Sequence, residues 1–202
     1  MKNSNNNKSS ILRNSVRAFA LLMVMAIVSF SQGLQAQSIY KISAGSQIKV
    51  SGTSNLHDWN MLASSFQCEG DFTVKNGQLQ EISSLNFALP VTNLKSKEDL
   101  MNTRAYKTLK SDQFNKITFK LTEATLMPQQ KIKAIGILNI AGVAKQVVLQ
   151  TSYILNSDGV ITCKGSETIK MSDFQIKAPS FMMGALKTGN EVIIDILLKL
   201  KK

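Results

Sequence analysis

The stretch Ser51-Gly-Thr-Ser-Asn-Leu-His-Asp-Trp59 contains the only histidine and the only tryptophan of this chain of 202 residues. A strand-like run, Ser65-Phe-Gln-Cys-Glu-Gly-Asp-Phe-Thr-Val74, follows it. Later in the chain stand Ile117-Thr-Phe-Lys120, Ile135-Gly-Ile-Leu-Asn-Ile-Ala-Gly-Val-Ala-Lys145 and Met171-Ser-Asp-Phe-Gln-Ile176. Each of these motifs is short, so the order in which they occur carries the information about the fold.

Apolar side chains recur at every second position from residue 85 to 91 and again from 117 to 121, which is the period of a half-buried strand. Further apolar runs and the tight-turn pairs Asn76-Gly77 and Asp158-Gly159 predict an antiparallel meander of about eight strands. Closing that many strands removes unpaired edges and leaves an interior that holds side chains or one slim ligand. We therefore predict an all-β fold, an antiparallel eight-stranded barrel.

In their order and separations, the quoted motifs resemble the YceI-like family, and the resemblance covers nearly all of the chain after residue 38. It implies an exported, lipocalin-like barrel that binds an isoprenoid lipid, either a polyisoprenoid or a quinone-like molecule. Asp99, Leu100 and Phe114 fit the family pattern, but Asn115-Lys116 stands where a proline is usual. A missing proline should cost only rigidity at the start of the next strand.

One helix is predicted between the strands, over residues 96–109. Ser96 can cap its first turn, with Asp99 in the place of the usual glutamate of a capping box. Ile135 and Ile137 belong to a strand that is apolar on both faces, so we expect the helix to cover part of the outside of the barrel. The helical side chains expected to face the barrel are Leu100, Met101, Tyr106 and Leu109.

Residues 1–36 predict a signal peptide, cleaved after Ala36. They carry four basic residues and no acid, followed by the apolar run 18–30. That run has roughly 13 residues, whereas a membrane-spanning helix needs roughly 20, so we expect no stable membrane anchor. Residues 37–202 should then form one barrel domain, located in the periplasm or secreted.

Losing four bases and no acid lowers the formal net charge from +11 to +7. A basic surface can steer a protein toward anionic lipids. The lysines are spread along the chain, however, so the simpler interpretation is a solvated exterior.

The sequence offers little catalytic chemistry. An enzyme of this size normally shows a base, an oriented nucleophile or a cluster of metal ligands. Asp58 follows His57, but neighbours in a strand point to opposite faces and form no evident dyad. Cys68 and Cys163 have no close zinc spacing with His57. With no glycine-rich phosphate loop and no basic stripe with interleaved aromatic residues, we expect no enzyme activity, metal, cofactor or nucleic-acid partner.

Cys68 and Cys163 leave two alternatives open. In an exported chain, two cysteines either pair or remain as small buried residues. A disulfide closing this long loop would stabilise the fold by on the order of 4 kcal/mol in the chain-entropy model.

The predicted ligand site is the inside of the barrel and its mouth. His57 and Asn55 are candidates to meet a polar head group, and Trp59 either lines the rim or packs under the helix. The segment 181–186 is a candidate lid, with packing over one barrel end as the alternative, because methionine adapts to irregular shapes. The predicted lining or mouth residues are His57, Trp59, Phe66, Phe87, Leu89, Ile117, Phe119, Leu138, Phe174, Phe181, Met182 and Met183.

Three functions fit the sequence. The leading hypothesis is a non-catalytic binding protein that holds a lipid in an apolar tunnel. The second is a structural or protein-interaction barrel whose core is filled by its own side chains. The third is an enzyme acting on a lipid head group with His57 as base. Ala88, Ala134 and Gly136 favour an open tunnel whereas Phe87 and Phe119 favour a filled one, and the oligomeric state, a homodimer included, is open.

Overall fold

The computed structural model describes residues 38–202, and of Phe181 and Met182 the backbone alone. The predicted signal peptide and its cleavage site after Ala36 lie outside the described residues. The strands are β1 (Ser38–Ile42), β2 (Gln47–Ser54), β3 (Trp59–Ala63), β4 (Gln67–Lys75), β5 (Gln78–Pro90), β6 (Lys116–Met127), β7 (Lys131–Ile140), β8 (Val143–Leu155), β9 (Ile161–Lys170), β10 (Ser180–Phe181) and β11 (Leu186–Lys201). The helical segments are η1 (Val91–Asn93), α2 (Asp99–Thr108), η2 (Met171–Phe174) and η3 (Met182–Gly184).

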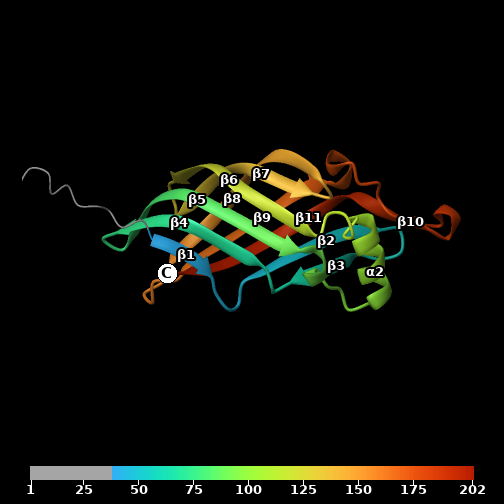
Figure 1. Ribbon diagram of the computed structural model, residues 1–202, viewed down its shortest axis with the longest axis horizontal. Coiled ribbons are helices and arrows are strands. Elements are labelled where there is room, and N and C mark those ends of the chain that lie inside the picture. The colour runs from blue at the N-terminus through green and yellow to red at the C-terminus, as the bar shows by residue number, and fades with distance from the viewer. Residues whose placement is uncertain (1–37) are drawn as a thin grey trace, which may run out of the picture. The chain divides into compact units, whose positions relative to one another are not determined.

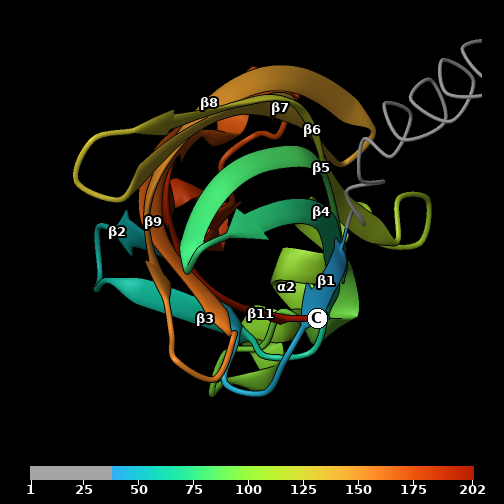
Figure 2. The same ribbon diagram turned by 90° about the vertical axis from the view of Figure 1, so that its left-hand side faces the viewer.

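The strands close into a ring in which every pairing is antiparallel. β4 to β9 pair in sequence order, β9 pairs with β11, and β11 returns to β1, which pairs with β4. β1 and β2 act as one interrupted strand, because both lie along the same edge of β11, while β2 pairs with β3 as β1 pairs with β4. The result is a closed barrel of eight strands, visible end-on in Figure 2, as the sequence predicted.

The step between β1 and β2 is tied to β11 by two serines. The Ser46 hydroxyl accepts the backbone N–H of Lys199 at 2.8 Å and donates to the Ser43 carbonyl at 2.9 Å. Ser43 donates its own N–H to the Lys199 carbonyl at 2.8 Å. Ser46 is buried, so these bonds satisfy polar groups that would otherwise face the apolar interior.

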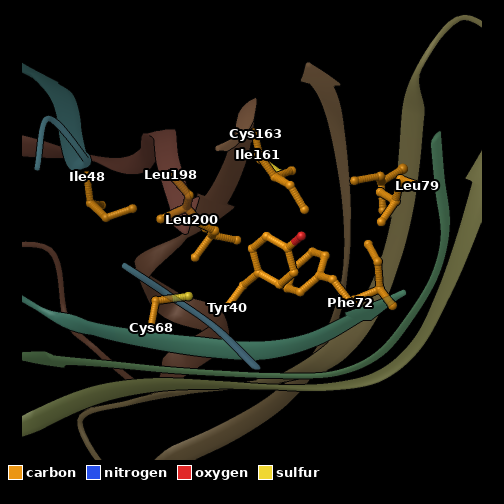
Figure 3. Packing of buried hydrophobic residues seen from close by; sticks show 11 residues of the cluster. Tyr40, Ile48, Cys68, Phe72, Leu79, Ile161, Cys163, Leu198 and Leu200 are labelled. Atoms are coloured by element: carbon orange, nitrogen blue, oxygen red, sulfur yellow. The ribbon is translucent and has the colours of Figure 1, made fainter. Parts of the chain in front are cut away.

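Large apolar side chains fill the half of the barrel that contains β1. Figure 3 shows Tyr40 against Phe72, with their ring centroids 5.4 Å apart, and Ile161 and Leu200 nearby. Phe72, Ile161 and Leu200 are fully buried. Inward positions alternate along each strand, as on β9, where Ile161 and Cys163 are buried while Lys164 is exposed.

The helix α2 lies at the end of the barrel opposite β1 (Figure 1) rather than over its outer wall. Met101 and Ala105 pack against the buried cluster around Met61, and the Tyr106 hydroxyl donates to the carbonyls of Thr92 and Leu94. Leu109 packs on a second cluster, around Phe119.

Leu100 was expected to face the barrel, and it borders the barrel interior although it is 60% exposed. The expectation that the helix covers part of the outer wall is wrong. It leaves Ile137 there exposed, because it packs across the barrel end instead.

The predicted capping box is also wrong. The helix begins at Asp99 with Glu98 as its N-cap residue, and no side chain caps it. The Ser96 hydroxyl instead accepts the Glu98 N–H at 3.1 Å, and the Ser96 N–H donates to the side-chain oxygen of buried Asn102. These bonds fix the segment before the helix rather than its first turn.

β8 and β9 pair only over part of their length. Their register runs from Leu155 with Ile161 to Thr151 with Gly165, and β9 then continues beside β11 alone. Phe174 of η2 packs at the level of this fork, in the cluster that also contains Val147 and Leu149 of β8. Gln175 ends η2 in the left-handed region, with φ of 56°.

Within residues 38–202, no helix is long and apolar enough to span a bilayer. Cys68 and Cys163 are both buried and free, so the disulfide is not formed in this structure. Burial raises the pKa of the Cys163 thiol from 9.0 to about 12. The pKa of Cys68 also rises to about 12, through burial first and then the nearby Cys163 and Glu69.

Replacing Ser46 by alanine should destabilise the protein by about 1–3 kcal/mol, because the buried N–H of Lys199 loses its acceptor. Urea unfolding of the two proteins measures this. Ser152→Ala is the matched control, since that exposed hydroxyl makes only a 3.4 Å contact to the Lys164 carbonyl. An equal effect of the two substitutions would contradict the role given to Ser46.

The two thiols should resist a thiol reagent such as DTNB at pH 8 in the folded protein and react once urea unfolds it. A raised pKa favours the neutral thiol in the folded state, so this contribution to stability is complete below pH 9 and is lost between about pH 9 and 12. Wild type should therefore lose more stability over that range than a Cys68→Ala/Cys163→Ala double variant. Rapid labelling of the native protein would show that the thiols are accessible.

Candidate ligand-binding cavity

The barrel encloses a cavity with a volume of about 360 Å³. This is within the range of pockets that hold small molecules. Its lining comes from β2 to β9, β11 and α2 and consists mostly of aliphatic and aromatic side chains. Of the two states that the sequence left open, the structure has the open one.

Small side chains at some inward positions leave the volume of the cavity open. Ala124 of β6 and Ala134 of β7 are register partners and both line the cavity, so the wall recedes there. Gly136 does not widen the cavity, because the ring of Phe119 covers it: a Cβ on Gly136 would lie 2.3 Å from the Phe119 Cζ.

Eight of the twelve predicted site residues line this cavity and so lie together in the barrel. They are His57, Trp59, Phe87, Leu89, Ile117, Phe119, Leu138 and Phe174. Phe66 is not in the lining; its ring packs against Phe87, with the ring centroids 5.3 Å apart. Met183 is fully exposed, and the side chains of Phe181 and Met182 lie outside the description.

His57 lies in the short loop between β2 and β3, on the lining of the cavity. The Ser54 hydroxyl accepts the N–H of His57 at 3.1 Å and donates to its carbonyl at 2.7 Å, which folds the loop back on itself. The imidazole Nδ1 is 2.9 Å from the backbone carbonyl of Asp58. A carbonyl only accepts, so Nδ1 donates to it, and the Asp58 carboxylate takes no part in orienting the ring.

Trp59 combines the two placements that the sequence left as alternatives. Its ring lines the cavity and also packs with the cluster that α2 covers. The indole N–H donates to the Thr53 carbonyl at 3.1 Å. Gly52 makes room for the ring, since a Cβ there would lie 2.3 Å from the Trp59 Cζ2. The indole is thus held by backbone on one side and faces the cavity on another.

The segment predicted as a lid, residues 181–186, is not a long loop. Ser180 and Phe181 of β10 pair with Lys187 and Leu186 of β11, so the segment is a short hairpin with η3 at its tip. Asn55, a candidate for a head group, binds this hairpin instead: its amide donates to the Ala185 carbonyl at 2.7 Å and accepts the Lys187 N–H at 2.9 Å. The β2–β3 loop and the hairpin are therefore joined.

Beside His57 and Trp59, the lining contains polar residues that were not predicted from the sequence. Ser54 lies on β2, Arg104 and Thr108 lie on α2, and Glu98 is the N-cap residue of α2. Thr151 of β8 and Glu167 of β9 line the cavity further along the strands. The alternation of Ile161, Cys163 and Ile169 on β9 would have placed Glu167 on the inner face, and this signal was available.

Among the described residues, no group of three or more histidine, cysteine, aspartate or glutamate side chains could hold a metal ion. Around His57, backbone and hydroxyl groups supply all the polar contacts that the structure shows. The arrangement can enclose an apolar molecule and offers it a few separate polar groups.

Comparison with solved structures shows the same fold in proteins of low sequence identity. BcnA of Burkholderia cenocepacia has 18% identity and a TM-score of 0.62, over 75% of this chain and 95% of that one. A polyisoprenoid-binding domain from Saccharophagus degradans, implicated in plant cell wall breakdown, has 11% identity and a TM-score of 0.61, over 82% and 98%. A YceI protein of Campylobacter jejuni has 17% identity and a TM-score of 0.53, over 67% and 81%.

Comparison with curated protein sequences finds no match. A family model for the YceI-like domain, in contrast, matches residues 40–200. This span runs from within β1 to the penultimate residue of β11, and it therefore includes the whole lining of the cavity. The match agrees with the closed barrel and the one α-helix among the described residues, and the chain belongs to the YceI-like family.

Proposed function

We propose that this protein binds an isoprenoid lipid, without covalent chemistry, in the cavity of its barrel. The observation that carries the proposal is a cavity of about 360 Å³ enclosed by mostly apolar side chains. The similarity in fold to a polyisoprenoid-binding domain supports the choice of lipid. The open cavity favours this function over the alternative of a barrel filled by its own side chains.

Burial of apolar surface supplies the affinity in this proposal. Covering a few hundred Å² of an isoprenoid tail, at about 25 cal/mol per Å², is worth on the order of 10 kcal/mol before the cost of ordering the ligand. Branched and aromatic side chains such as Ile194, Leu149 and Phe87 provide that surface. Such a wall fits a slim, flexible hydrocarbon and discriminates between ligands by their width and length.

The ligand enters at the end of the barrel that carries α2, because the opposite half is filled by the cluster around Phe72 and Leu200. His57, Arg104 and Thr108 supply polar groups at this mouth, which the ligand passes on entry. We further propose that the protein acts outside the cytoplasm and is not an enzyme. The proposal of export rests on the basic and apolar segments before Ala36, and the lack of catalysis on the absence of a dyad at His57.

The full-length protein, exported from a bacterial host and examined by native mass spectrometry with lipid extraction, should carry an isoprenoid in a one-to-one complex. Ala134→Phe should reduce the bound fraction at least tenfold, because the new ring would occupy the recess beside Ala124. Ala144→Phe makes the same change on an exposed position of β8 and should leave binding unchanged.

Thermal unfolding of both variants serves as the folding control. A wild-type unfolding temperature in Ala134→Phe would show that its loss of lipid comes from a blocked cavity and not from misfolding. A wild-type protein that stays free of ligand when offered polyprenols and isoprenoid quinones would refute the proposal. Equal loss of lipid in Ala134→Phe and Ala144→Phe would place the ligand elsewhere.

A further inference from the structure

Glu167 is an unusual member of the cavity lining. It lies on the inner face of β9, in the same alternation as Cys163 and Ile169, and is half-buried. Its register partner is Ile194, and the wall around it is otherwise largely aliphatic. No residue within 38–202 forms a hydrogen bond or ion pair with its carboxylate. A carboxylate facing an apolar cavity costs stability unless a partner compensates it, so its position calls for an explanation.

Thr151 is a second polar group at the same place. It lies on the inner face of β8 opposite Gly165, two positions from Glu167, and it lines the cavity as well. Its hydroxyl, like the carboxylate, has no hydrogen-bond partner among the described residues. In a regular ladder the Cα atoms of such diagonal neighbours are about 7–8 Å apart. No hydrogen bond joins these two side chains, so one ligand group can bind both.

The fork between the strands opens at this level. Pairing of β8 with β9 ends at Thr151 and Gly165, and beyond it Glu167 is paired only with β11. The two polar groups therefore lie where the pairing of β8 with β9 ends. Of the two, the carboxylate only accepts a hydrogen bond, while the threonine hydroxyl both donates and accepts.

We infer that Glu167 and Thr151 form a polar subsite that recognises a hydroxyl group on the lipid. The ligand hydroxyl donates to the Glu167 carboxylate and accepts from the Thr151 hydroxyl. The ligand class is thus an isoprenoid with a free hydroxyl, and the subsite disfavours a phosphate at this position because the carboxylate repels it. This inference rests on the proposed function and names the substrate class of the same cavity.

The test uses the exported protein, freed of lipid, with geranylgeraniol and its methyl ether as probes. The two molecules share one tail, but the ether has no hydrogen to donate. Trp59, the only tryptophan, lines the cavity and reports binding by its fluorescence. We expect the alcohol to bind at least tenfold tighter than the ether, since hydrogen bonds to charged groups are the stronger ones.

The variants assign this preference to residues. Glu167→Leu should bind the two probes alike, with affinity for the ether unchanged or higher, and Thr151→Val should reduce the preference severalfold. Glu191→Gln removes an exposed carboxylate that pairs with Lys170 on the outside, and it should keep the full preference. Thermal unfolding checks that each variant is folded.

The outcomes separate the inference from the proposed function. If wild type bound the alcohol and the ether equally, the subsite would be refuted while lipid binding would stand. A preference for the alcohol that survives in both Glu167→Leu and Thr151→Val would also overturn it. If neither probe, nor any longer polyprenol, bound to wild type, the proposed function itself would fail.

Discussion

The barrel depends on hydrogen-bonded partners along both edges of β11. One edge pairs with β9 from Glu191 to Leu200. The other edge pairs first with β2 and then with β1. Between these two strands, at Lys199, the backbone of β11 forms hydrogen bonds with Ser43 and Ser46 instead of with a strand. Because this seam closes the ring, inward side chains face a shared interior instead of solvent. A slip of one residue there would turn every inward residue of β11 outward.

Within a closed ring of eight strands, the volume of the inward side chains decides which part of the interior is open. Such a barrel has just enough interior for side chains or one small ligand. Tyr40, Phe72 and Leu200 fill the half that contains β1, and the cavity begins beside this cluster, where Ala124 and Ala134 lie side by side. The backbone is the same in both halves. The volume open to a ligand is therefore set by a few inward positions.

The period of two along the strands and the turn pairs were enough to predict an eight-stranded antiparallel barrel, and most predicted lining residues followed from the same alternation. The helix position did not follow, because amphipathicity shows which face is apolar but not which surface it meets. Asn55 and Phe66 were misjudged for a related reason: their partners, Ala185, Lys187 and Phe87, are distant in sequence. Whether the cavity is open was also beyond the sequence, since Gly136 is small but covered by Phe119.

An apolar wall and a polar group inside it have different physical roles. Burial of hydrocarbon is non-directional, so a uniform tube holds an isoprenoid chain tightly but lets it slide along the axis. A hydrogen bond is directional and short, so a single fixed acceptor such as Glu167 selects one position among many of nearly equal apolar contact. The cost of keeping an unpaired carboxylate in the empty cavity lowers the stability of the ligand-free protein. The same cost increases the difference in binding free energy between a ligand that forms a hydrogen bond with the carboxylate and one that does not. Specificity depends on this difference.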